Sequence, residues 1–372
     1  MLAMADSPRH MHQALGLAAQ ALFLSSPNPR VGCVLVAPDG RVVGQGFTQQ
    51  AGGPHAEVMA LRDAVARGED VRGATAYVTL EPCSHQGRTG PCCDALIAAG
   101  VAKVVGALTD PNPQVAGQGF ARLRAAGVDV VVGPGADESR ELNIGFFSRM
   151  LRGIPWVRMK AASSLDGATA LHNGTSQWIT SPEARADGHA WRARACTLLT
   201  GIGTVLEDDP RLNVRDVATP RQPRIAVVDS RLDMPLTARA LQGPAECLIY
   251  TSSRDASKTS ALQDLGATVI PMPNAHGKVD LCAMLRDLAA RGTNELHVEA
   301  GFKLNGSLVR EGLVDELLLY LAPKLLGTGG MGIASFGPLD ALSEALALAL
   351  HDVQRIGPDL RVVARVVDRA SF

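Results

Sequence analysis

The chain has 372 residues, of which 46% are hydrophobic and 20% charged, and its formal net charge is −1 at pH 7. Its length predicts two domains, and its composition supplies enough apolar residues for a core in each. The near-neutral charge gives no support for nucleic-acid or membrane partners, and no run approaches the roughly 18–20 apolar residues of a membrane span. Seven scattered cysteines, an odd number, are not typical of a secreted disulfide protein. We therefore expect a cytoplasmic protein without a signal peptide.

The first half of the chain alternates segments typical of helices and of strands. Helices are predicted over residues 10–24, 55–66, 92–99, 120–126 and 137–150. Strands are predicted over residues 31–36, 41–47, 74–80, 103–108 and 128–132. Pro27 and Pro29 end the first helix, because proline excludes a continued helix. This alternation predicts a largely parallel sheet that is covered by helices on both faces.

A second series of strands and helices starts after a boundary near residues 151–155. Strands are predicted over residues 156–162, 197–201, 224–229, 247–250, 295–299, 316–321 and 361–367. Helices are predicted over residues 181–195, 258–265, 281–291 and 303–311. The Ala/Leu-rich run at 341–350 is expected to belong to the fold and not to a linker.

A pattern of metal-binding side chains lies in the first half, in PHAEV at 54–58 and TLEPCSHQGRTGPCC at 79–93. Thiolates and a neutral imidazole are the ligands that Zn²⁺ prefers, and His55, Cys83 and Cys92 would leave a fourth position for water. His-x-Glu followed by Pro-Cys and a second Cys is typical of zinc nucleobase deaminases, in which the glutamate is an acid/base and not a ligand. Glu57 would accept the proton of that water and pass it to the leaving ammonia.

The predicted helix ends refine this picture. Cys92 and His55 lie near helix N-termini, where the macrodipole is expected to favour a thiolate at Cys92 and to resist protonation of His55. Residues two apart in an ideal helix point about 200° away from each other, so His55 must lie at the very end if Glu57 is to face the water. The alternatives are a closed site with Cys93 or His85 as fourth ligand, or simply buried thiols. Cys93 and Cys33 are expected to be packing residues.

The segments NPRVG, HAE and EPCSHQGRTGPC together resemble the deaminase domain of the bifunctional deaminase–reductase family of riboflavin biosynthesis. The resemblance implies that His55, Cys83 and Cys92 bind zinc and that Glu57 transfers protons. It also implies that Asn28 contacts the substrate, although Asn28 between two prolines equally fits a turn. Gly90 departs from the family, which usually carries proline there.

The second half lacks a G-x-G-x-x-G motif after a strand, so a Rossmann nucleotide site is not expected. Polar residues instead gather where predicted strands meet loops. Arg192, Arg211 and Arg215 could hold a phosphate, and Lys160 or Asp208 could move protons. Each of these residues alone also fits a turn or a solvated surface.

Taken together, K-x-A-x-S-x-D-G, SQWITS, T-V-x-x-D-D-P-x-L, VDS and VEAG resemble the reductase domain of the same family, whose fold resembles dihydrofolate reductase. The resemblance implies substrate contacts at Ser176, Arg192, Leu212, Arg215 and Glu299. It implies NADPH contacts at Ala162, Trp178, Thr204, Asp208, Ser230 and a loop formed by Gly301, Phe302, Lys303, Leu304, Asn305, Gly306 and Ser307. Phe302 and Lys303 depart from the small residues that the family commonly has.

We therefore predict an α/β protein with a cytidine-deaminase-like α/β/α sandwich at 1–151 and a dihydrofolate-reductase-like domain at 152–372. The expected function is zinc-dependent deamination of a pyrimidine ribosylamino phosphate, followed by NADPH-dependent reduction of its ribosyl group. A homo-oligomer is compatible with the sequence, and no nucleic-acid or membrane partner is expected. The alternatives are a tRNA-type adenosine deaminase, a deaminase with a nucleotide-sensing second domain, and a structural zinc module.

Overall fold

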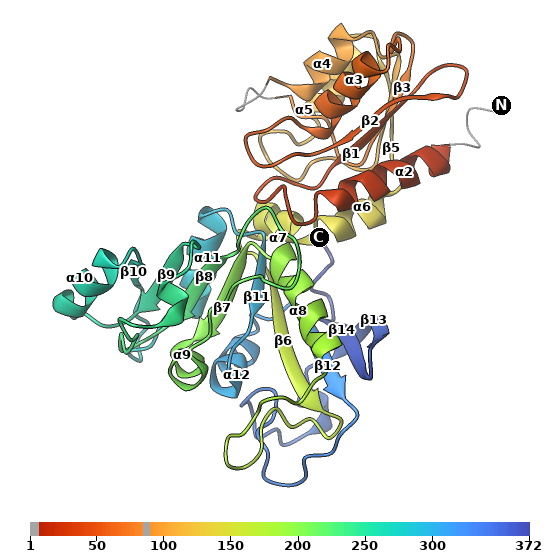
Figure 1. Ribbon diagram of the computed structural model, residues 1–372. Helices are drawn as coiled ribbons and strands as arrows, with labels where there is room; N and C mark the ends of the chain where they lie inside the picture. Colours follow the sequence, from red (N-terminus) through yellow and green to blue (C-terminus); the bar gives the residue numbers. More distant parts are fainter. Residues whose placement is uncertain (1–6, 85–89) are drawn as a thin grey trace. The chain divides into compact units, whose positions relative to one another are not determined.

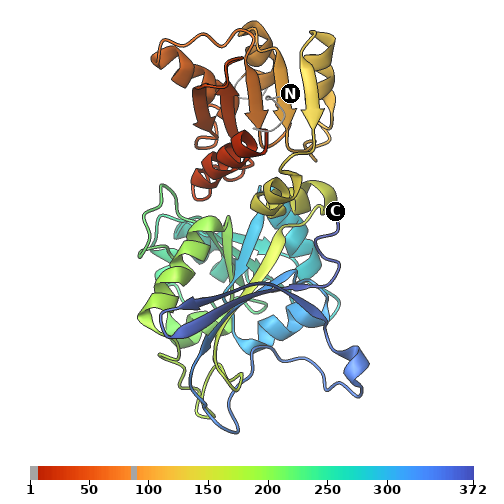
Figure 2. The ribbon, with the colours of Figure 1, turned by 90° about the vertical axis from the view of Figure 1, so that its right-hand side faces the viewer.

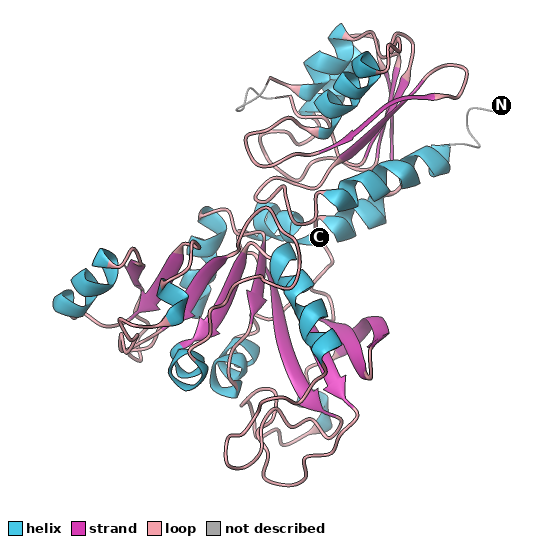
Figure 3. Cartoon of the chain, in the orientation of Figure 1, coloured by secondary structure: helices cyan, strands magenta, loops and turns pink. Residues whose placement is uncertain are grey.

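The computed structural model describes residues 7–84 and 90–372. The chain divides into two compact units, Met1–Arg152 and Gly153–Phe372 (Figure 1). Both units combine strands and helices (Figure 3), so the predicted α/β class is confirmed. None of the helices in the described ranges is long and apolar enough to cross a membrane.

The first unit is a three-layer sandwich around a five-stranded sheet of order β2-β1-β3-β4-β5. Its strands are β1 (Gly32–Val36), β2 (Val42–Phe47), β3 (Thr75–Val78), β4 (Lys103–Gly106) and β5 (Asp129–Val132). Its helices are α2 (Ser7–Gln20), α3 (Ala56–Ala66), α4 (Cys92–Ala98), α5 (Gln118–Ala125), α6 (Ala136–Leu142) and α7 (Ile144–Arg152). β3, β4 and β5 are parallel, whereas β1 is antiparallel to both of its neighbours. Helices α3, α4 and α5 cover one face, and α2 and α6 lie on the other (Figure 1).

Glycines in the strands let helices of this unit approach the sheet closely, as Gly32 and Gly46 show. A Cβ atom on Gly32 would lie 1.9 Å from the carbonyl oxygen of Ala14 in α2. A Cβ atom on Gly46 would lie 2.5 Å from the amide nitrogen of Ala60 in α3 and 2.5 Å from Cβ of Met59. Real Cβ contacts are not this short, so α2 and α3 rest on positions of the sheet that have no side chain.

The second unit is built on a nine-stranded sheet of order β10-β9-β8-β7-β11-β6-β12-β14-β13. Its strands are β6 (Trp156–Ser164), β7 (Thr197–Gly201), β8 (Arg224–Val228), β9 (Cys247–Thr251), β10 (Thr268–Pro271), β11 (Glu295–Val298), β12 (Glu316–Ala322), β13 (Leu348–Ile356) and β14 (Asp359–Val366). The strands from β10 to β12 are parallel, and β14 pairs antiparallel with both β12 and β13 (Figure 2). The helices are α8 (Pro182–Arg194), α9 (Ile202–Asp208), α10 (Ala256–Asp264), α11 (Leu281–Ala290) and α12 (Phe302–Arg310), with 3₁₀ turns at Arg239–Leu241 and Leu342–Glu344.

An ion network lies inside the second unit. Arg158 in β6 is 1% exposed and pairs with two buried carboxylates, Glu295 in β11 (2.9 Å) and Glu316 in β12. Arg194 also pairs with Glu295 (2.7 Å), and Arg365 pairs with Glu316 (3.0 Å). Buried charges require such partners, because an unpaired ion in the interior is costly.

Several predicted elements differ from the structure. The single helix expected over 137–150 is two helices, α6 and α7, which meet at Asn143. The buried Asn143 amide accepts from the backbone N–H of Arg30 (2.7 Å) and donates to its carbonyl (2.9 Å). This fixes the side chain to another segment and interrupts the helix. Strands β10 and β13 and helix α9 were not predicted, and the run at 341–350 contributes a 3₁₀ turn and the start of β13.

Candidate functional site

The three predicted metal ligands converge in the first unit. His55 is the N-cap of α3, Cys83 follows β3 and Cys92 is the first residue of α4. Nδ1 of His55 lies 3.6 Å from Sγ of Cys83 and 3.4 Å from Sγ of Cys92, and the three ligand atoms lie within 4.8 Å of one another. One imidazole and two thiols fit a tetrahedral zinc site with one open position. The N-cap position of His55 is the helix end that the sequence pattern requires.

Glu57 lies in the first turn of α3 and is 3% exposed. Burial and the negative charge of Cys83 raise the pKa of its carboxyl to about 7. A carboxyl group whose pKa lies near neutral pH can both accept and return a proton. Its burial beside the ligands therefore suits the acid/base role that the sequence predicts.

Hydrogen bonds among the three ligands dominate their pKa values, so the expected effect of the helix dipoles stays a prediction. A hydrogen bond with Cys92 lowers the pKa of Cys83 to about 4, and the same contact raises the pKa of Cys92. The pKa of His55 is raised, first because of its hydrogen bond with Cys83.

The alternative fourth ligands do not join this cluster in the part of the chain that the structure describes. Cys93 is buried, its Sγ lies 3.8 Å from Oδ1 of Asp94, and burial raises its pKa to about 11. Cys33 is a fully buried core residue of β1. His85 lies outside the described residues. Asn28 closes a turn in which its N–H donates to the carbonyl of Ser25 (2.8 Å), so its substrate contact stays a prediction.

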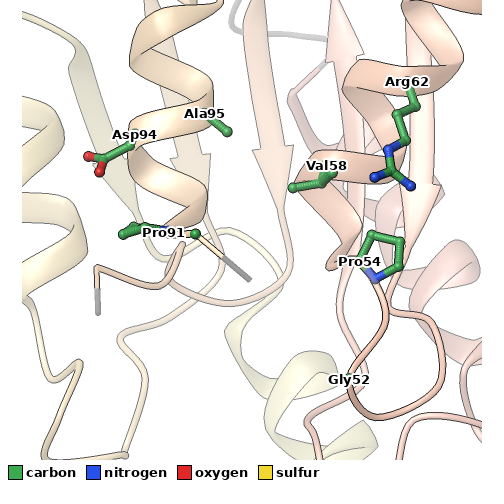
Figure 4. Close-up of a pocket in the computed structure, with 8 residues that line it drawn as sticks. Gly52, Pro54, Val58, Arg62, Pro91, Asp94 and Ala95 are labelled. Atoms are coloured by element: carbon green, nitrogen blue, oxygen red, sulfur yellow. The ribbon is translucent and has the colours of Figure 1, made fainter. Parts of the chain in front are cut away.

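A pocket of about 660 Å³ lies between the starts of α3 and α4, and its lining includes neither the three ligands nor Glu57. Pro54, which precedes His55, and Pro91, which precedes Cys92, both line it (Figure 4). The other lining residues are Gly52, Val58, Arg62, Gly90, Asp94 and Ala95. Its volume suits a small molecule, and Arg62 and Asp94 provide charge on opposite helices. The sequence pattern did not indicate Arg62 or Asp94, because single charged residues on helices are usually solvated.

In the second unit, a half-buried ion pair joins two predicted substrate residues. Arg192 of α8 donates from Nε and Nη2 to the two carboxylate oxygens of Glu299 (2.5 and 2.7 Å), and from Nη1 to the carbonyl of Asn213 (3.1 Å). Burial opposes ionisation, but Arg192 holds the pKa of Glu299 well below its usual value. Lys160 of β6 interacts with this pair, and burial lowers its pKa while Glu299 opposes that shift.

The remaining predicted residues of this unit lie in several places. Asp208 is exposed at the end of α9 and accepts from Nε2 of Gln177 (3.0 Å), so it lies close to the segment that carries Ser176 and Trp178. Trp178 is 63% exposed and stacks on Arg185 (4.5 Å). The exposed Arg215 lies 3.4 Å from the side-chain oxygen of Asn213.

Other members of the predicted set are packed or hydrogen-bonded within the unit. Leu212 is 3% exposed and belongs to the hydrophobic core. The hydroxyl of Ser230 accepts from the N–H of Val279 (3.2 Å) at the ends of β8 and β9. Ala162 is half-buried at the end of β6 and packs beside Tyr320. Their predicted ligand contacts are taken up below as proposals.

The helix predicted from residue 303 is confirmed as α12 (Phe302–Arg310), and of the predicted cofactor loop 301–307 Gly301 alone lies outside this helix. Gly301 is the N-cap of α12, and Phe302 to Ser307 form its first two turns. A Cβ atom on Gly301 would lie 3.8 Å from Oγ1 of Thr204 in α9, so these helix starts are neighbours. Lys303 is exposed on the first turn, and Phe302 and Leu304 are half-buried. The amide of Asn305 is tied to the carbonyls of Ala300 and Ile333, and Gly306 packs against Ser335.

Two histidines near the second site were missed. Nε2 of His297, a fully buried residue, lies 3.3 Å from Oε1 of Glu299. Nε2 of His189 lies 3.2 Å from Oδ2 of Asp216, and His189 is 4% exposed. The signal for His297 was its place two residues before Glu299 in a strand, since alternate residues of a strand share a face.

Comparison with known proteins agrees with both halves of this description. Residues 4–108 match the model of the cytidine and deoxycytidylate deaminase zinc-binding region. Residues 155–362 match the model of the RibD C-terminal domain. Each match covers one of the two sites.

Full-length relatives extend these matches over the whole chain. The riboflavin biosynthesis protein RibD of Escherichia coli (strain K12) is 46% identical over 363 residues, covering 94% of this chain and 97% of that protein. RibD of Haemophilus influenzae is 43% identical, covering 95% of both. A solved structure of Acinetobacter baumannii RibD has a TM-score of 0.88 at 40% identity, covering 97% of this chain and 99% of that one. A Thermotoga maritima structure has a TM-score of 0.87 at 32% identity, covering 97% and 98%. The chain therefore belongs to the RibD family of riboflavin biosynthesis proteins, with a zinc-binding deaminase domain followed by a reductase domain.

Proposed function

We propose that this chain catalyses two consecutive reactions. The first removes the 2-amino group of 2,5-diamino-6-(5-phosphoribosylamino)pyrimidin-4-one by hydrolysis, and the second uses NADPH to reduce the ribosyl to the ribityl side chain. The product is 5-amino-6-(5-phosphoribitylamino)uracil. The convergence of His55, Cys83 and Cys92 beside the buried Glu57 carries the first assignment. The Thermotoga maritima relative is described as a diaminohydroxyphosphoribosylaminopyrimidine deaminase/5-amino-6-(5-phosphoribosylamino)uracil reductase, which supports both.

In the deaminase domain, His55, Cys83 and Cys92 hold the zinc ion, which when bound supplies Lewis acidity and lowers the pKa of water. The carboxylate of Glu57 accepts the proton of the attacking water and returns it to the departing amine. Its pKa of about 7 suits this exchange at neutral pH. Asn28 contacts the pyrimidine.

In the reductase domain, bound NADPH would supply the hydride that reduces C1′ of the ring-opened imine, and Lys160 or Asp208 donates the proton. Lys160 has the stronger structural support, because burial lowers its pKa below the usual value and makes its ammonium a better proton donor. The residues that would hold the cofactor are Ala162, Trp178, Thr204, Asp208, Ser230 and residues 301–307. The substrate contacts Ser176, Leu212, Arg215 and Glu299.

The two arginines of the substrate site have different roles. The N–H donors of Arg192 already bind Glu299 and Asn213. Arg192 therefore positions Glu299, and Glu299 contacts the substrate. Arg215 is exposed and donates over 3.4 Å to Asn213, so it is available to bind the substrate phosphate. Arg215→Ala should raise the KM of the reductase and change kcat little, because a phosphate contact is made equally in the ground and transition states.

A single assay tests both reactions. The zinc-loaded protein, the diaminopyrimidine phosphate and NADPH are mixed, and ammonia release and NADPH absorbance are followed together. Ammonia release followed by matching NADPH loss supports the proposal. Glu57→Gln should lower ammonia release by about 10²- to 10⁴-fold while NADPH loss with pre-deaminated substrate is unchanged. Ammonia release without NADPH loss would leave the second domain as a nucleotide-sensing one. The absence of both ammonia release and NADPH loss would refute the assignment.

We place the domain boundary between residues 151 and 152, which the division into units after Arg152 supports. We also propose a cytoplasmic homo-oligomer whose contact includes β13. This strand pairs only with β14 and exposes Leu348 (42%), Leu350 (72%) and Val353 (52%). An apolar edge strand is a surface that proteins normally cover. Light scattering after size-exclusion chromatography should give a multiple of 39.0 kDa, and Leu350→Lys should shift it towards the monomer.

A further inference from the structure

One buried carboxylate in the first unit has an unusual set of partners. Glu81, two residues before Cys83, is 4% exposed. Its Oε2 accepts from the backbone N–H groups of Asp110 (3.1 Å) and Gly117 (2.9 Å). Its Oε1 accepts from those of Gly119 (2.8 Å) and Phe120 (3.1 Å). Four amide donors from a segment 29 to 39 residues away thus meet on one side chain.

The four donors belong to one loop and the helix that follows it. Gly119 and Phe120 lie in the first turn of α5, where backbone N–H groups have no partner inside the helix and the dipole favours a negative charge. The Glu81 carboxylate therefore caps α5 from outside and fixes the loop before it. The contact is also close-packed, because a Cβ atom on Gly119 would lie 2.0 Å from the carbonyl oxygen of Pro82.

A second contact ties α5 to the segment that carries the metal ligand. Arg122 of α5 donates to the carbonyl of Ser84 (3.3 Å) and forms an ion pair with Asp94 of α4 (2.7 Å). The segment 81–84 is thereby attached to α5 on both sides of Cys83. Cys83 also contacts α4. Its Sγ accepts a hydrogen bond from the N–H of Cys92 (3.3 Å), and its backbone carbonyl accepts one from the N–H of Cys93 (3.2 Å).

We propose that Glu81 is a positioning residue for the metal ligand Cys83, acting by clamping the loop 110–117 and the start of α5 to the strand end that carries the thiolate. The inference rests on the proposed zinc site and adds to it a residue that touches neither metal nor substrate. Partners behind the ligands of a metal site commonly contribute 10- to 100-fold to metal affinity, because they hold the ligand where the ion needs it.

Glu81→Gln is the informative change. A glutamine has nearly the same shape, but its NH₂ group must face one pair of backbone N–H donors, so at least two of the four hydrogen bonds are lost. Glu138→Gln is the matched control, because it is the same substitution at an exposed position of α6 in the same unit. Glu81→Asp retains the charge but not the reach, and should lie between the two.

The readout is Zn²⁺ affinity of the full chain in competition with a chelator, together with the absorption spectrum of the Co²⁺-loaded protein. We expect Glu81→Gln to bind Zn²⁺ about 10- to 100-fold more weakly than Glu138→Gln and to change the thiolate–cobalt bands. Hydrogen exchange of β1 and β3 reports whether the unit is folded. An affinity within threefold of the control overturns the inference. Loss of protection across β1 and β3 in both Glu81 variants also overturns it, because the residue is then only structural.

A second variant separates this inference from the zinc site itself. Cys83→Ser should lose Zn²⁺ if the proposed site is correct. If Cys83→Ser keeps wild-type affinity, the proposed metal site is wrong. If Cys83→Ser loses the ion and Glu81→Gln does not, only the role of Glu81 is wrong.

Discussion

Arg158→Met tests the buried ion network of the second unit. Arg158 lies between Glu295 and Glu316, all three about 1% exposed, and its guanidinium stacks on Trp191 at 4.5 Å. Methionine fills much of the same space but leaves the two carboxylates with one arginine each, Arg194 and Arg365. Removing one partner of a buried ion pair typically costs 3–5 kcal/mol, and the remaining partners should keep this change near the lower end, about 3 kcal/mol.

The cost should depend on pH with a defined sign. Burial disfavours the Glu316 anion, but Arg158 and the neighbouring arginines lower the pKa of Glu316 below its usual value. A lowered carboxyl pKa contributes stability above the unfolded pKa of about 4.3, and this stability is lost as the pH falls through the folded pKa. Arg158→Met removes part of that contribution. The difference from wild type should therefore be largest near pH 7 and shrink below about pH 4.3.

The assay is urea unfolding followed by tryptophan fluorescence. All three tryptophans, Trp156, Trp178 and Trp191, lie in the second unit, so the signal reports that unit alone. Arg231→Met is the control, because Arg231 is 82% exposed in its pair with Asp233 and should change stability by less than about 0.5 kcal/mol. A loss below 1 kcal/mol at pH 7, or a loss that grows on acidification, would refute the reasoning. Deaminase activity should be retained.

Three further outcomes follow from the structure. Gly306→Ala should cost about 1–3 kcal/mol in the same unfolding assay, because a Cβ atom at position 306 would lie 1.9 Å from the carbonyl oxygen of Ser335. Gly188→Ala is the control: position 188 in α8 has open space around it, so alanine there should stabilise the unit by about 0.5–1 kcal/mol. Burial, and then neighbouring arginines, lower the pKa of His189 to about 4. The unfolded chain therefore binds more protons than the folded chain between about pH 6.5 and 4, and stability falls as the pH drops through that window. His189→Gln should remove up to about 3 kcal/mol of this fall, and an unchanged dependence of the unfolding free energy on pH would contradict the prediction. Stripping the metal with a chelator should abolish ammonia release but not NADPH oxidation with pre-deaminated substrate. Equal loss of both activities would contradict the prediction that only the deaminase reaction requires the metal.

The metal centre could be predicted because its ligands and its acid/base residue lie in two short sequence motifs. Imidazole, carboxyl and thiol groups in His-x-Glu and Pro-Cys identify the ion without any knowledge of the fold, and the strand and helix ends then place them. The charge distribution could not be predicted in the same way. It depends on contacts of 3.6 and 3.4 Å from Nδ1 of His55 to the thiols of Cys83 and Cys92, which only the fold brings together.

The second unit shows a different limit. The strand that carries Arg158 was predicted, but its ion partners are 137 and 158 residues away, and no local pattern identifies them. The break at Asn143 has the same origin, because its partner Arg30 is 113 residues distant. Helix α12 was predicted from residue 303, but the contacts of Asn305 with Ile333 and of Gly306 with Ser335 could not be predicted, because these partners are distant in the sequence.

A close contact between α3 and the sheet has a consequence for protein engineering. α3, which presents His55 and Glu57 at its first turn, rests on Gly46, where even a methyl group would collide with Ala60. A mutational library that varies only residues in contact with the ion or the substrate would leave this position out. We expect position 46 nevertheless to be among the least tolerant in such a library. Any larger side chain there would lift the whole helix, and with it both chemical groups, without altering either of them.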